Sequence, residues 1–242
     1  MIQAARTRTY DFGLSPCGGL RTTVAQTQVV FRASGALWIE AARMLVVADL
    51  HLEKGSAYAV RGQMLPPYDT RDTLGRLTAE IGATRPLNVV LLGDSFHDAR
   101  AEGRLAAEDA ERLRLLAGLT RLIWAVGNHD AEGPRSLPGD VVDEVAVEGL
   151  VLRHEPTEGL ITGEVAGHLH PCARVAGPRG SVRRRCFVTD GERLVIPAFG
   201  AYAGGLSVRD DAFGSLFTRA PLVGAMGAGR VHAVGWRSVV GD

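Results

Sequence analysis

The chain has 242 residues, of which 46% are hydrophobic, so it can bury a full core, and we expect one domain covering residues 1–242. Its 27 basic and 27 acidic residues give zero net charge, which excludes a global attraction to polyanions or membrane surfaces, so any nucleic-acid contact must be local. Three scattered cysteines without a CxxC pair argue against a disulfide framework or a thiolate zinc site. With neither a signal-peptide core nor a membrane-length apolar run, the expected protein is cytoplasmic, with reduced thiols and no membrane partner.

The first half of the chain alternates apolar runs with segments of helical period. We expect a partly ordered arm at 1–27, a hairpin of 29–31 and 36–40 about Ser34 and Gly35, a strand at 44–48 and an irregular loop to Tyr68. A helix follows from a cap at Asp69 or Thr70 to Gly82. The last elements of this half are a strand at 88–92, a helix at 101–118 and a strand at 121–126. Strands separated by helices predict a largely parallel sheet with right-handed crossovers. The loop carries Tyr58, Arg61 and Tyr68, which either face a substrate or are ordinary surface residues.

Beyond residue 140 the pattern changes to short strands separated by turn residues. The expected strands are 141–147, 150–153, 161–166, 182–188 and 194–196. We therefore expect a mostly antiparallel second sheet that packs on the first. Residues 199–242 are glycine-rich and receive few assignments, and His232 is given no role.

Several of these strands end in polar groups of one kind. The run 89–92 is apolar and partly β-branched, as in a strand buried on both faces, and it stops at Gly93 and Asp94. Because ligands bind at the carboxyl ends of strands in helix-covered sheets, chemistry is expected at Asp94. The other endings are Asp49 and His51 after 44–48, Asn128 and His129 after 121–126, His154 after 150–153, and His168 and His170 after 161–166.

These endings supply carboxylate, imidazole and amide donors, a mixture that suits Mn²⁺, Fe²⁺, Ni²⁺ or Zn²⁺ better than Ca²⁺ or Mg²⁺. In Asp-x-His and His-x-His, residues i and i+2 of an extended segment point the same way, so that one segment donates two ligands. These donors are more than one metal ion with an open coordination position requires. Two cations about 3.5–4 Å apart that share a bridging carboxylate would use all of them.

Five segments in this order, 49–51, 93–94, 127–130, His154 and 167–170, resemble the motifs of the calcineurin-like metallophosphoesterase superfamily. Within it, residues 48–54, 92–98, 167–171 and 196–202 are similar to bacterial ligase-associated DNA damage response endonucleases, and this resemblance covers most of the chain. The resemblance implies an α/β fold, a four-layer αββα sandwich in which two packed mixed β-sheets are flanked by helices. It also implies manganese, a homodimer and a functional link to a DNA ligase, a helicase and an exonuclease.

The resemblance also implies a role for each matching residue. One metal would be held by Asp49, His51 and His170, the other by Asn128, His154 and His168, and Asp94 would bridge them. A metal-bound water or hydroxide would attack the phosphorus in line, while His129 would contact the phosphate or protonate the leaving oxygen. Where many superfamily members have Gly-Asp-x-x-Asp, this chain has His97, which we expect to contact the ligands or the substrate, or else to pack beside the strand end.

Some of these residues have a structural alternative when taken alone. A lone His154 is more often structural, and Asn128 can be a turn residue before Asp130, but membership of the ordered set favours ligation. The run Arg183–Arg185 either contacts a phosphate backbone or is a solvated surface, because alternate strand residues face opposite sides.

Three functions fit this pattern. The one we favour is a dinuclear-metal phosphodiesterase that cleaves single-stranded or structured DNA as an endonuclease in DNA repair. The second is the same chemistry on a small nucleotide or cyclic nucleotide, which the zero net charge does not disfavour. The third is a non-catalytic scaffold on the same fold, which is least expected because a scaffold needs neither the ligand set nor His129.

Overall fold

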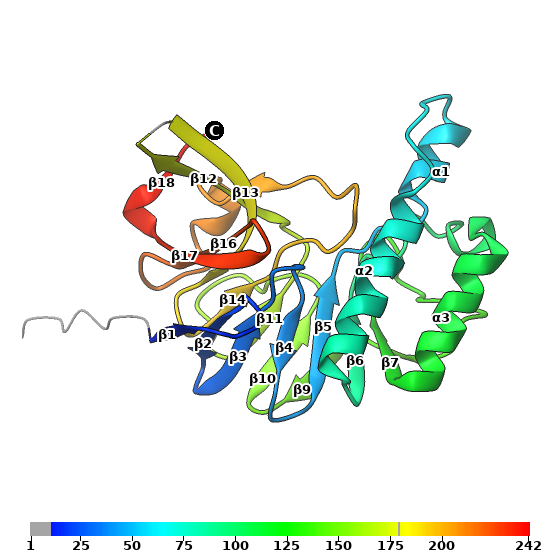
Figure 1. Ribbon diagram of the computed structural model, residues 1–242, viewed down its shortest axis with the longest axis horizontal. Helices are drawn as coiled ribbons and strands as arrows, with labels where there is room; N and C mark the ends of the chain where they lie inside the picture. Colours follow the sequence, from blue (N-terminus) through cyan, green and yellow to red (C-terminus); the bar gives the residue numbers. More distant parts are fainter. Residues whose placement is uncertain (1–10, 179) are drawn as a thin grey trace, which may run out of the picture.

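The first sheet contains eight strands that follow one another in sequence order (Figure 1). The computed structural model describes residues 11–178 and 180–242. The strands are β1 (Phe12–Leu14), β2 (Leu20–Val24), β3 (Thr27–Phe31), β4 (Leu37–Ile39), β5 (Met44–Ala48), β6 (Asn88–Leu92), β7 (Arg121–Ala125) and β8 (Asp140–Val142). Strands β1 to β5 pair antiparallel, whereas β5 to β8 pair parallel. The predicted hairpin and parallel strands are therefore confirmed.

The expected arm at 1–27 is wrong for residues 11–27, and residues 1–10 lie outside the described residues. Residues 12–14 and 20–24 form β1 and β2, and β2 buries Leu20, Thr22 and Val24 on one face. Because a threonine occupies one of these buried positions, the apolar alternation of the strand is incomplete in the sequence.

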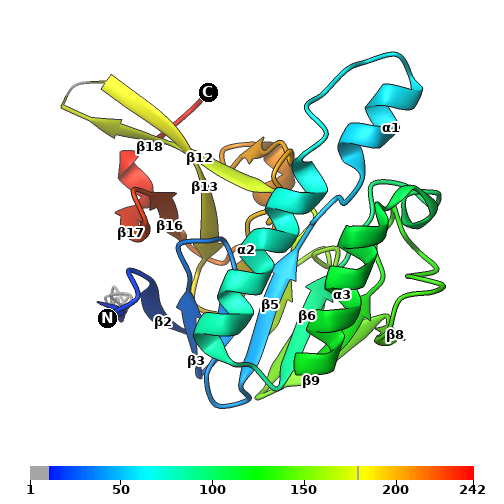
Figure 2. The ribbon, with the colours of Figure 1, turned by 45° about the vertical axis from the view of Figure 1, so that its right-hand side comes forward.

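Two long helices, α2 (Asp69–Thr84) and α3 (Ala107–Leu119), cover the outer face of the parallel strands (Figure 2). Helix α2 buries the predicted apolar face of Leu74, Leu77 and Ile81. Its N-cap is Tyr68, so the predicted cap at Asp69 or Thr70 is wrong, and the helix runs past Gly82 to Thr84.

Two further segments differ from the prediction. Residues 102–104 form a 3₁₀ turn, η1 (Glu102–Arg104), so α3 begins six residues later than the predicted position 101. A short helix, α1 (Lys54–Val60), lies in the segment expected to be irregular. It buries only Gly55 and Ala57, and such small residues give no hydrophobic period that the sequence could reveal.

The second sheet is mixed and contains ten strands. They are β9 (Glu144–Val147), β10 (Leu150–Arg153), β11 (Glu164–Ala166), β12 (Pro171–Gly177), β13 (Gly180–Thr189), β14 (Leu194–Val195), β15 (Leu206–Ser207), β16 (Leu222–Gly227), β17 (Arg230–Gly235) and β18 (Val239–Val240). Most pairs are antiparallel, as predicted, but β10, β11 and β14 are parallel neighbours. The expected strand at 141–147 is two strands, since β8 joins the first sheet and β9 the second.

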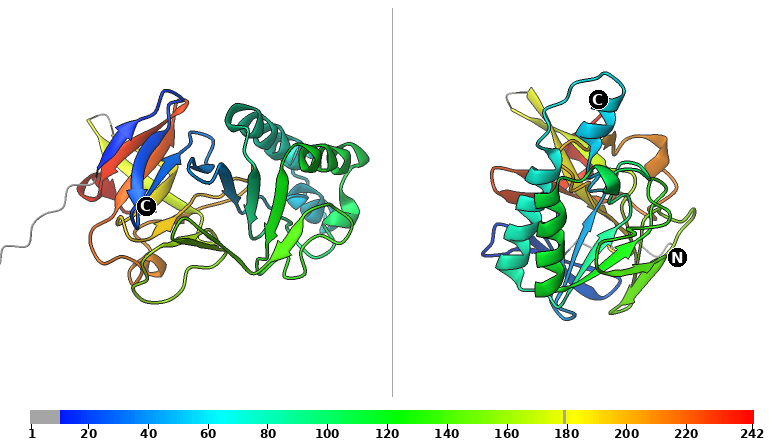
Figure 3. Two further views of the ribbon diagram at one scale, coloured as in Figure 1. Left: turned by 90° about the horizontal axis from the view of Figure 1, so that it is seen from below. Right: turned by 90° about the vertical axis from the view of Figure 1, so that its right-hand side faces the viewer.

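The two sheets pack face to face, which confirms the predicted pair of mixed sheets (Figure 3). In β5, Val46 faces the second sheet and Val47 faces the helices, and both are fully buried. Phe31 of the first sheet stacks on Phe187 of the second, with ring centroids 4.4 Å apart. Among the described residues, the α-helices lie on the first sheet only.

The outer face of the second sheet is covered by irregular chain. Val208, Phe213 and Leu216 pack there, and η2 (Asp211–Phe213) is a single 3₁₀ turn within this segment. Another 3₁₀ turn, η3 (Trp236–Ser238), precedes β18. No helix of the described ranges has the length and apolar character needed to cross a membrane.

Candidate metal centre

The strand ends of both sheets bring their polar residues to one place. The loops after β5, β6 and β7 of the first sheet meet the loops after β10 and β11 of the second. All seven predicted ligands and the predicted catalytic histidine lie in these loops: Asp49, His51, Asp94, Asn128, His129, His154, His168 and His170.

Asp49, His51 and His170 form the first group. Their ligand atoms all lie within 4.8 Å of one another. His51 Nε2 is 3.2 Å from His170 Nε2, which is 3.3 Å from Asp49 Oδ1. Imidazole nitrogens that bind one cation at about 2.1 Å, with bond angles near 90–110°, are roughly 3 Å apart. The spacing therefore fits a shared cation.

Asp94, His154 and His168 form the second group, and Asn128 joins it. His154 Nε2 lies 2.9 Å from Asn128 Oδ1, 3.2 Å from His168 Nδ1 and 3.4 Å from Asp94 Oδ1. One ring N–H cannot point at three partners at once, whereas a cation among them can interact with all. This group can therefore hold a second cation.

Asp94 lies between the two groups. Its Oδ2 is 3.9 Å from His51 Nε2, and its Oδ1 faces His154. The backbone N–H of His129 donates to Asp94 Oδ1 at 3.0 Å, which fixes the carboxylate. This position is the one expected of a bridging ligand.

The protonation states of these groups favour cation binding. Burial and the neighbouring His170 lower the pKa of His51 to about 3, so its ring is neutral near pH 7. Burial would raise the pKa of Asp94, but the hydrogen bond and charge of His154, the N–H of His129 and the charge of His51 together outweigh it, and the pKa falls to about 2. Neutral imidazole and ionised carboxylate are the forms that bind metals.

The surroundings of His154 and His51 also favour a bound positive charge at this position. Burial opposes the charged form of His154, but Asp94 and then Asp49 raise its pKa, so the carboxylates attract a proton or a metal to this ring. The Nδ1 atom of His51 is buried without a hydrogen-bond partner among the described residues. The donor set therefore fits the pair of divalent cations that the sequence predicts.

The ligand loops adopt an uncommon backbone conformation. Five of the predicted ligands have positive φ angles between 45° and 63°: Asp49, His51, Asp94, His168 and His170. Non-glycine residues rarely adopt this left-handed region, and such strain concentrates at functional sites. The expectation that i and i+2 of an extended segment project together is therefore wrong here, since left-handed turns direct these side chains.

Gly93 allows the two sheets to meet at the centre. A Cβ atom added to Gly93 would lie 2.1 Å from His154 Nδ1, and the φ of this glycine is +72°. Any side chain would therefore collide with the ring of His154 and strain the backbone. The glycine that ends the β6 run is required by this close approach.

Asp130 supports the first-sheet loops, a role that the sequence analysis did not assign. Its buried carboxylate accepts backbone N–H bonds from Ser95 at 2.7 Å, Phe96 at 3.1 Å and Gly127 at 3.0 Å. Burial raises its pKa above the ordinary value despite these bonds. In the sequence, the position of Asp130 two residues after Asn128 was the signal that could have pointed to this supporting role. The carboxylate links the loops after β6 and β7.

Arg185 supports the other side of the centre and was also missed. Its guanidinium donates to the carbonyls of Ala198, Gly200, Ala201 and Ala203 at 2.8–3.3 Å. These acceptors lie in one loop, 198–203, which we call the support loop. Arg185 is half-buried and engaged by the support loop, whereas its neighbours in the run, at 183 and 184, are exposed.

The support loop contacts the turn that carries Asp49. The N–H of Phe199 donates to Ala48 O at 2.7 Å, and the N–H of Gly200 donates to Asp49 O at 3.1 Å. A Cβ atom at Gly200 would lie 2.2 Å from Leu50 O, so only glycine allows this approach. Arg185 thus acts on the first group through the support loop.

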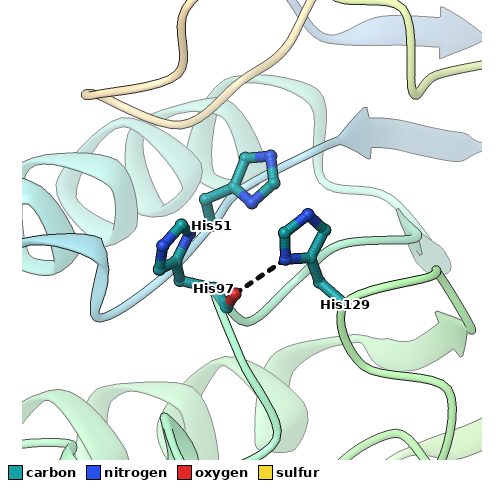
Figure 4. A group of neighbouring side chains, drawn as sticks. All are labelled: His51, His97 and His129. Atoms are coloured by element: carbon teal, nitrogen blue, oxygen red, sulfur yellow. Dashed lines mark hydrogen bonds between the residues drawn. The ribbon is translucent and has the colours of Figure 1, made fainter. Parts of the chain in front are cut away.

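His97 and His129 lie at the open side of the centre beside His51 (Figure 4). His129 Nδ1 is 2.8 Å from the carbonyl oxygen of His97, which orients the ring. The side chain of His129 is 40% exposed, and its Nε2 is 3.9 Å from Asp94 Oδ2. His97 stacks on His129 with ring centroids 5.6 Å apart, so His97 also lies at the open side of the centre.

Of the three residues singled out in the loop before α2, one reaches the centre's edge. The ring of Tyr58, in α1, lies 5.9 Å from that of His97. Arg61 and Tyr68 are exposed. His232 is exposed on β17, in the second sheet.

Comparisons with known proteins agree with this geometry. Residues 42–188 match the calcineurin-like phosphoesterase family. The crystal structure of Pseudomonas putida nuclease MPE is 26% identical over 93% of this chain and 100% of that one, with a TM-score of 0.66. Yfce, a phosphoesterase from E. coli, is 18% identical over 79% of this chain and 98% of its own, with a TM-score of 0.38. No curated protein sequence matches. The chain belongs to the calcineurin-like phosphoesterase family and is a phosphoester hydrolase of that metal-dependent class.

Proposed function

We propose that this protein is a dinuclear-metal nuclease that cleaves DNA phosphodiesters as an endonuclease. The observation that carries the proposal is the position of Asp94 between two groups, each able to hold one cation. Similarity to a nuclease over 93% of the chain supports a nucleic-acid substrate. By the resemblance seen in the sequence, we extend the proposal to Mn²⁺, to a homodimer, and to DNA repair together with a ligase, a helicase and an exonuclease.

The metal assignments are part of this proposal. Asp49, His51 and His170 would hold one cation, Asn128, His154 and His168 would hold the other, and Asp94 would be a ligand of both. When bound, the cations supply Lewis acidity, which polarises a phosphoester and lowers the pKa of an attacking water. The chain's own residues fix where this happens, because Asp130 and Arg185 hold the loops that carry the proposed ligands.

His129 has a different task. Its Nδ1 is engaged by the carbonyl of His97, so Nε2 is directed to the exposed side beside Asp94. In the imidazolium form Nε2 also carries a proton, and in this position it can donate a hydrogen bond to a phosphate oxygen or pass that proton to the leaving oxygen, which leaves a neutral ring protonated at Nδ1. His97 holds His129 through its backbone and forms the wall of the same opening.

A metal-content measurement joined to a substrate panel tests the proposal. Purified protein, loaded with Mn²⁺, Fe²⁺, Ni²⁺ or Zn²⁺, is assayed on single-stranded and hairpin DNA, on cyclic nucleotides and on bis(p-nitrophenyl) phosphate. We expect two bound ions per chain, loss of activity in chelator and efficient cleavage within DNA. A much higher kcat/KM on a cyclic nucleotide would favour the small-substrate alternative. No turnover of any diester would favour the scaffold alternative.

The role of His129 is tested separately from that of the ligands. We expect His129→Ala to retain two ions and to lower kcat by roughly 10²–10⁴-fold, the contribution of a positioned acid or base. A loss of bound metal in this variant would show that His129 is a ligand instead.

A further inference from the structure

A groove with an excess of positive charge lies over helix α2, behind the support loop. It has a volume of about 740 Å³ and is lined by four arginines, two from α2, one from α3 and one from β13. We call it the α2 arginine groove: Arg71, Arg76, Arg112 and Arg185. Gly75 lies between the α2 arginines, and open space surrounds the position of its absent Cβ.

The charges of the two inner arginines are not neutralised by the protein. Arg185 is engaged by the carbonyls of the support loop, and Arg76 donates to Phe199 O of the same loop. Within the part of the chain that the structure describes, no carboxylate oxygen lies within 4.0 Å of either guanidinium. Burial and the nearby charge of Arg185 lower the pKa of Arg76. Partly buried like charges are costly unless an anion joins them.

The outer arginines extend this positive surface. Arg71 pairs with Glu108 at 3.0 Å on its exposed side, and Arg112 has a contact of 3.5 Å with the carbonyl of Arg71. Asp72 is the one acidic residue among those that line the groove. In a chain with no net charge, four guanidiniums beside the two carboxylates of Asp72 and Glu108 still give a local positive potential.

The position of the groove connects it to the metal centre. Its inner wall is the support loop, whose opposite side donates hydrogen bonds to Ala48 O and Asp49 O. A polymer that passes the centre and crosses this loop therefore enters the groove.

We propose that the α2 arginine groove binds backbone phosphates of the nucleic-acid strand that flanks the cleaved bond. This inference rests on the proposed nuclease function and deepens it. Guanidinium groups match phosphate oxygens in charge and geometry. Such contacts position a strand without recognising its sequence, so the groove gives affinity and register to substrates of any sequence.

The test uses the salt dependence of binding, which reports phosphate contacts directly. The full-length Arg71→Gln/Arg112→Gln double variant, kept metal-free in EDTA, is titrated with a fluorescent single-stranded oligonucleotide at several NaCl concentrations. We expect the slope of log Kobs against log [NaCl] to become less negative by about 1.4, which is about 0.7 for each lost contact. A matched control, Arg114→Gln/Arg230→Gln, removes two exposed arginines outside the groove and should keep the wild-type slope.

Cleavage provides the second measurement. With Mn²⁺ bound, the groove variant should lose more kcat/KM on the oligonucleotide than on bis(p-nitrophenyl) phosphate, which has no flanking strand to bind in the groove. If the folded groove variant keeps the wild-type slope of log Kobs against log [NaCl] and still cleaves DNA, the proposed phosphate binding by the groove is overturned. The nuclease proposal then stands. Wild-type protein that hydrolyses the small diester but neither binds nor cleaves DNA would overturn the nuclease proposal, and the groove with it.

Discussion

The loops at the ends of the two sheets are held by two side chains of opposite charge, the buried Asp130 and the half-buried Arg185. On the first sheet, the carboxylate of Asp130 accepts N–H groups from the loops after β6 and β7. On the second sheet, the guanidinium of Arg185 donates to four carbonyls of the support loop. Each charge collects the backbone groups that strand pairing leaves unpaired.

The two arrangements differ in what they connect. Asp130 joins two neighbouring loops of one sheet, so its effect is local to the parallel strands. Arg185 holds a loop that reaches across to Asp49 of the other sheet. The centre therefore depends on the first sheet for both of its carboxylates, Asp49 and Asp94, and on the second sheet for the contact between the sheets. Substitutions on either side should affect different measurable quantities.

The largest effect is expected where the two sides meet. Asp94→Ala should reduce metal-dependent hydrolysis of bis(p-nitrophenyl) phosphate to background, because both cation groups lose the residue between them. It should also reduce the rise in melting temperature on adding Mn²⁺, since a ligand that binds the folded state stabilises it. Thermal unfolding with and without Mn²⁺ measures this rise.

The matched control for this prediction is Asp143→Asn, an exposed carboxylate between β8 and β9. This variant should keep both the hydrolytic activity and the rise in melting temperature on adding Mn²⁺. An active Asp94→Ala protein would contradict the assignment of the centre.

The next effect concerns the second-sheet support. Arg185→Gln should weaken Mn²⁺ binding by about 10–100-fold, the usual cost of removing a group that positions metal ligands. Calorimetric titration of Mn²⁺ into metal-free protein measures it. Arg184→Gln, which changes the exposed neighbour on the same strand, should bind Mn²⁺ like the wild type. Equal affinities in both variants would show that the support loop does not position Asp49.

Asp130→Asn should act mainly on folding stability. An asparagine offers an NH₂ group where the carboxylate offered an oxygen, so at least one of the three N–H donors loses its acceptor. The cost is about 1–3 kcal/mol for a buried unsatisfied group. Urea unfolding of the metal-free protein measures it, and an unchanged midpoint would show that water replaces the carboxylate.

The smallest effect is a pH dependence remote from the centre. Asp190, between β13 and β14, accepts N–H bonds from Arg193 and Thr218. Burial alone would raise its pKa, but these bonds outweigh burial and lower it. Its stabilisation is therefore complete above the unfolded pKa of about 3.9 and is lost as the pH falls through the lower folded value.

The pH dependence is measured by comparing the wild type with Asp190→Asn. The wild type should be more stable to urea at pH 7, and the difference should shrink below about pH 4. A difference that stays constant down to pH 3 would contradict the lowered pKa.

The parts of the molecule that could be predicted from sequence are those in which the signal is local. Strands β5, β6 and β7 are short apolar runs that end in polar residues, so both the strands and the proposed ligands could be named. Their spatial convergence followed from the rule for parallel strands. The parallel trio β10, β11 and β14 then brought His154, His168 and His170 to the same place.

The missed features depend on contacts between distant segments. Arg185 lies in a run of three arginines, and nothing in that run shows that a loop 13–18 residues later supplies its acceptors. Helix α1 buries only small residues, and β16 and β17 lie in a glycine-rich tail without a clear period. In each case tertiary packing, which local patterns do not encode, determines the structure.

The left-handed backbone at five proposed ligands sets folding stability against activity. Glycine at His168 or His170 would relax the main chain, yet it would remove a donor atom from the centre. Selection for thermal stability alone would therefore replace these residues first. Improved variants should be sought on the covering helices outside the α2 arginine groove, where a gain in stability does not compete with hydrolysis.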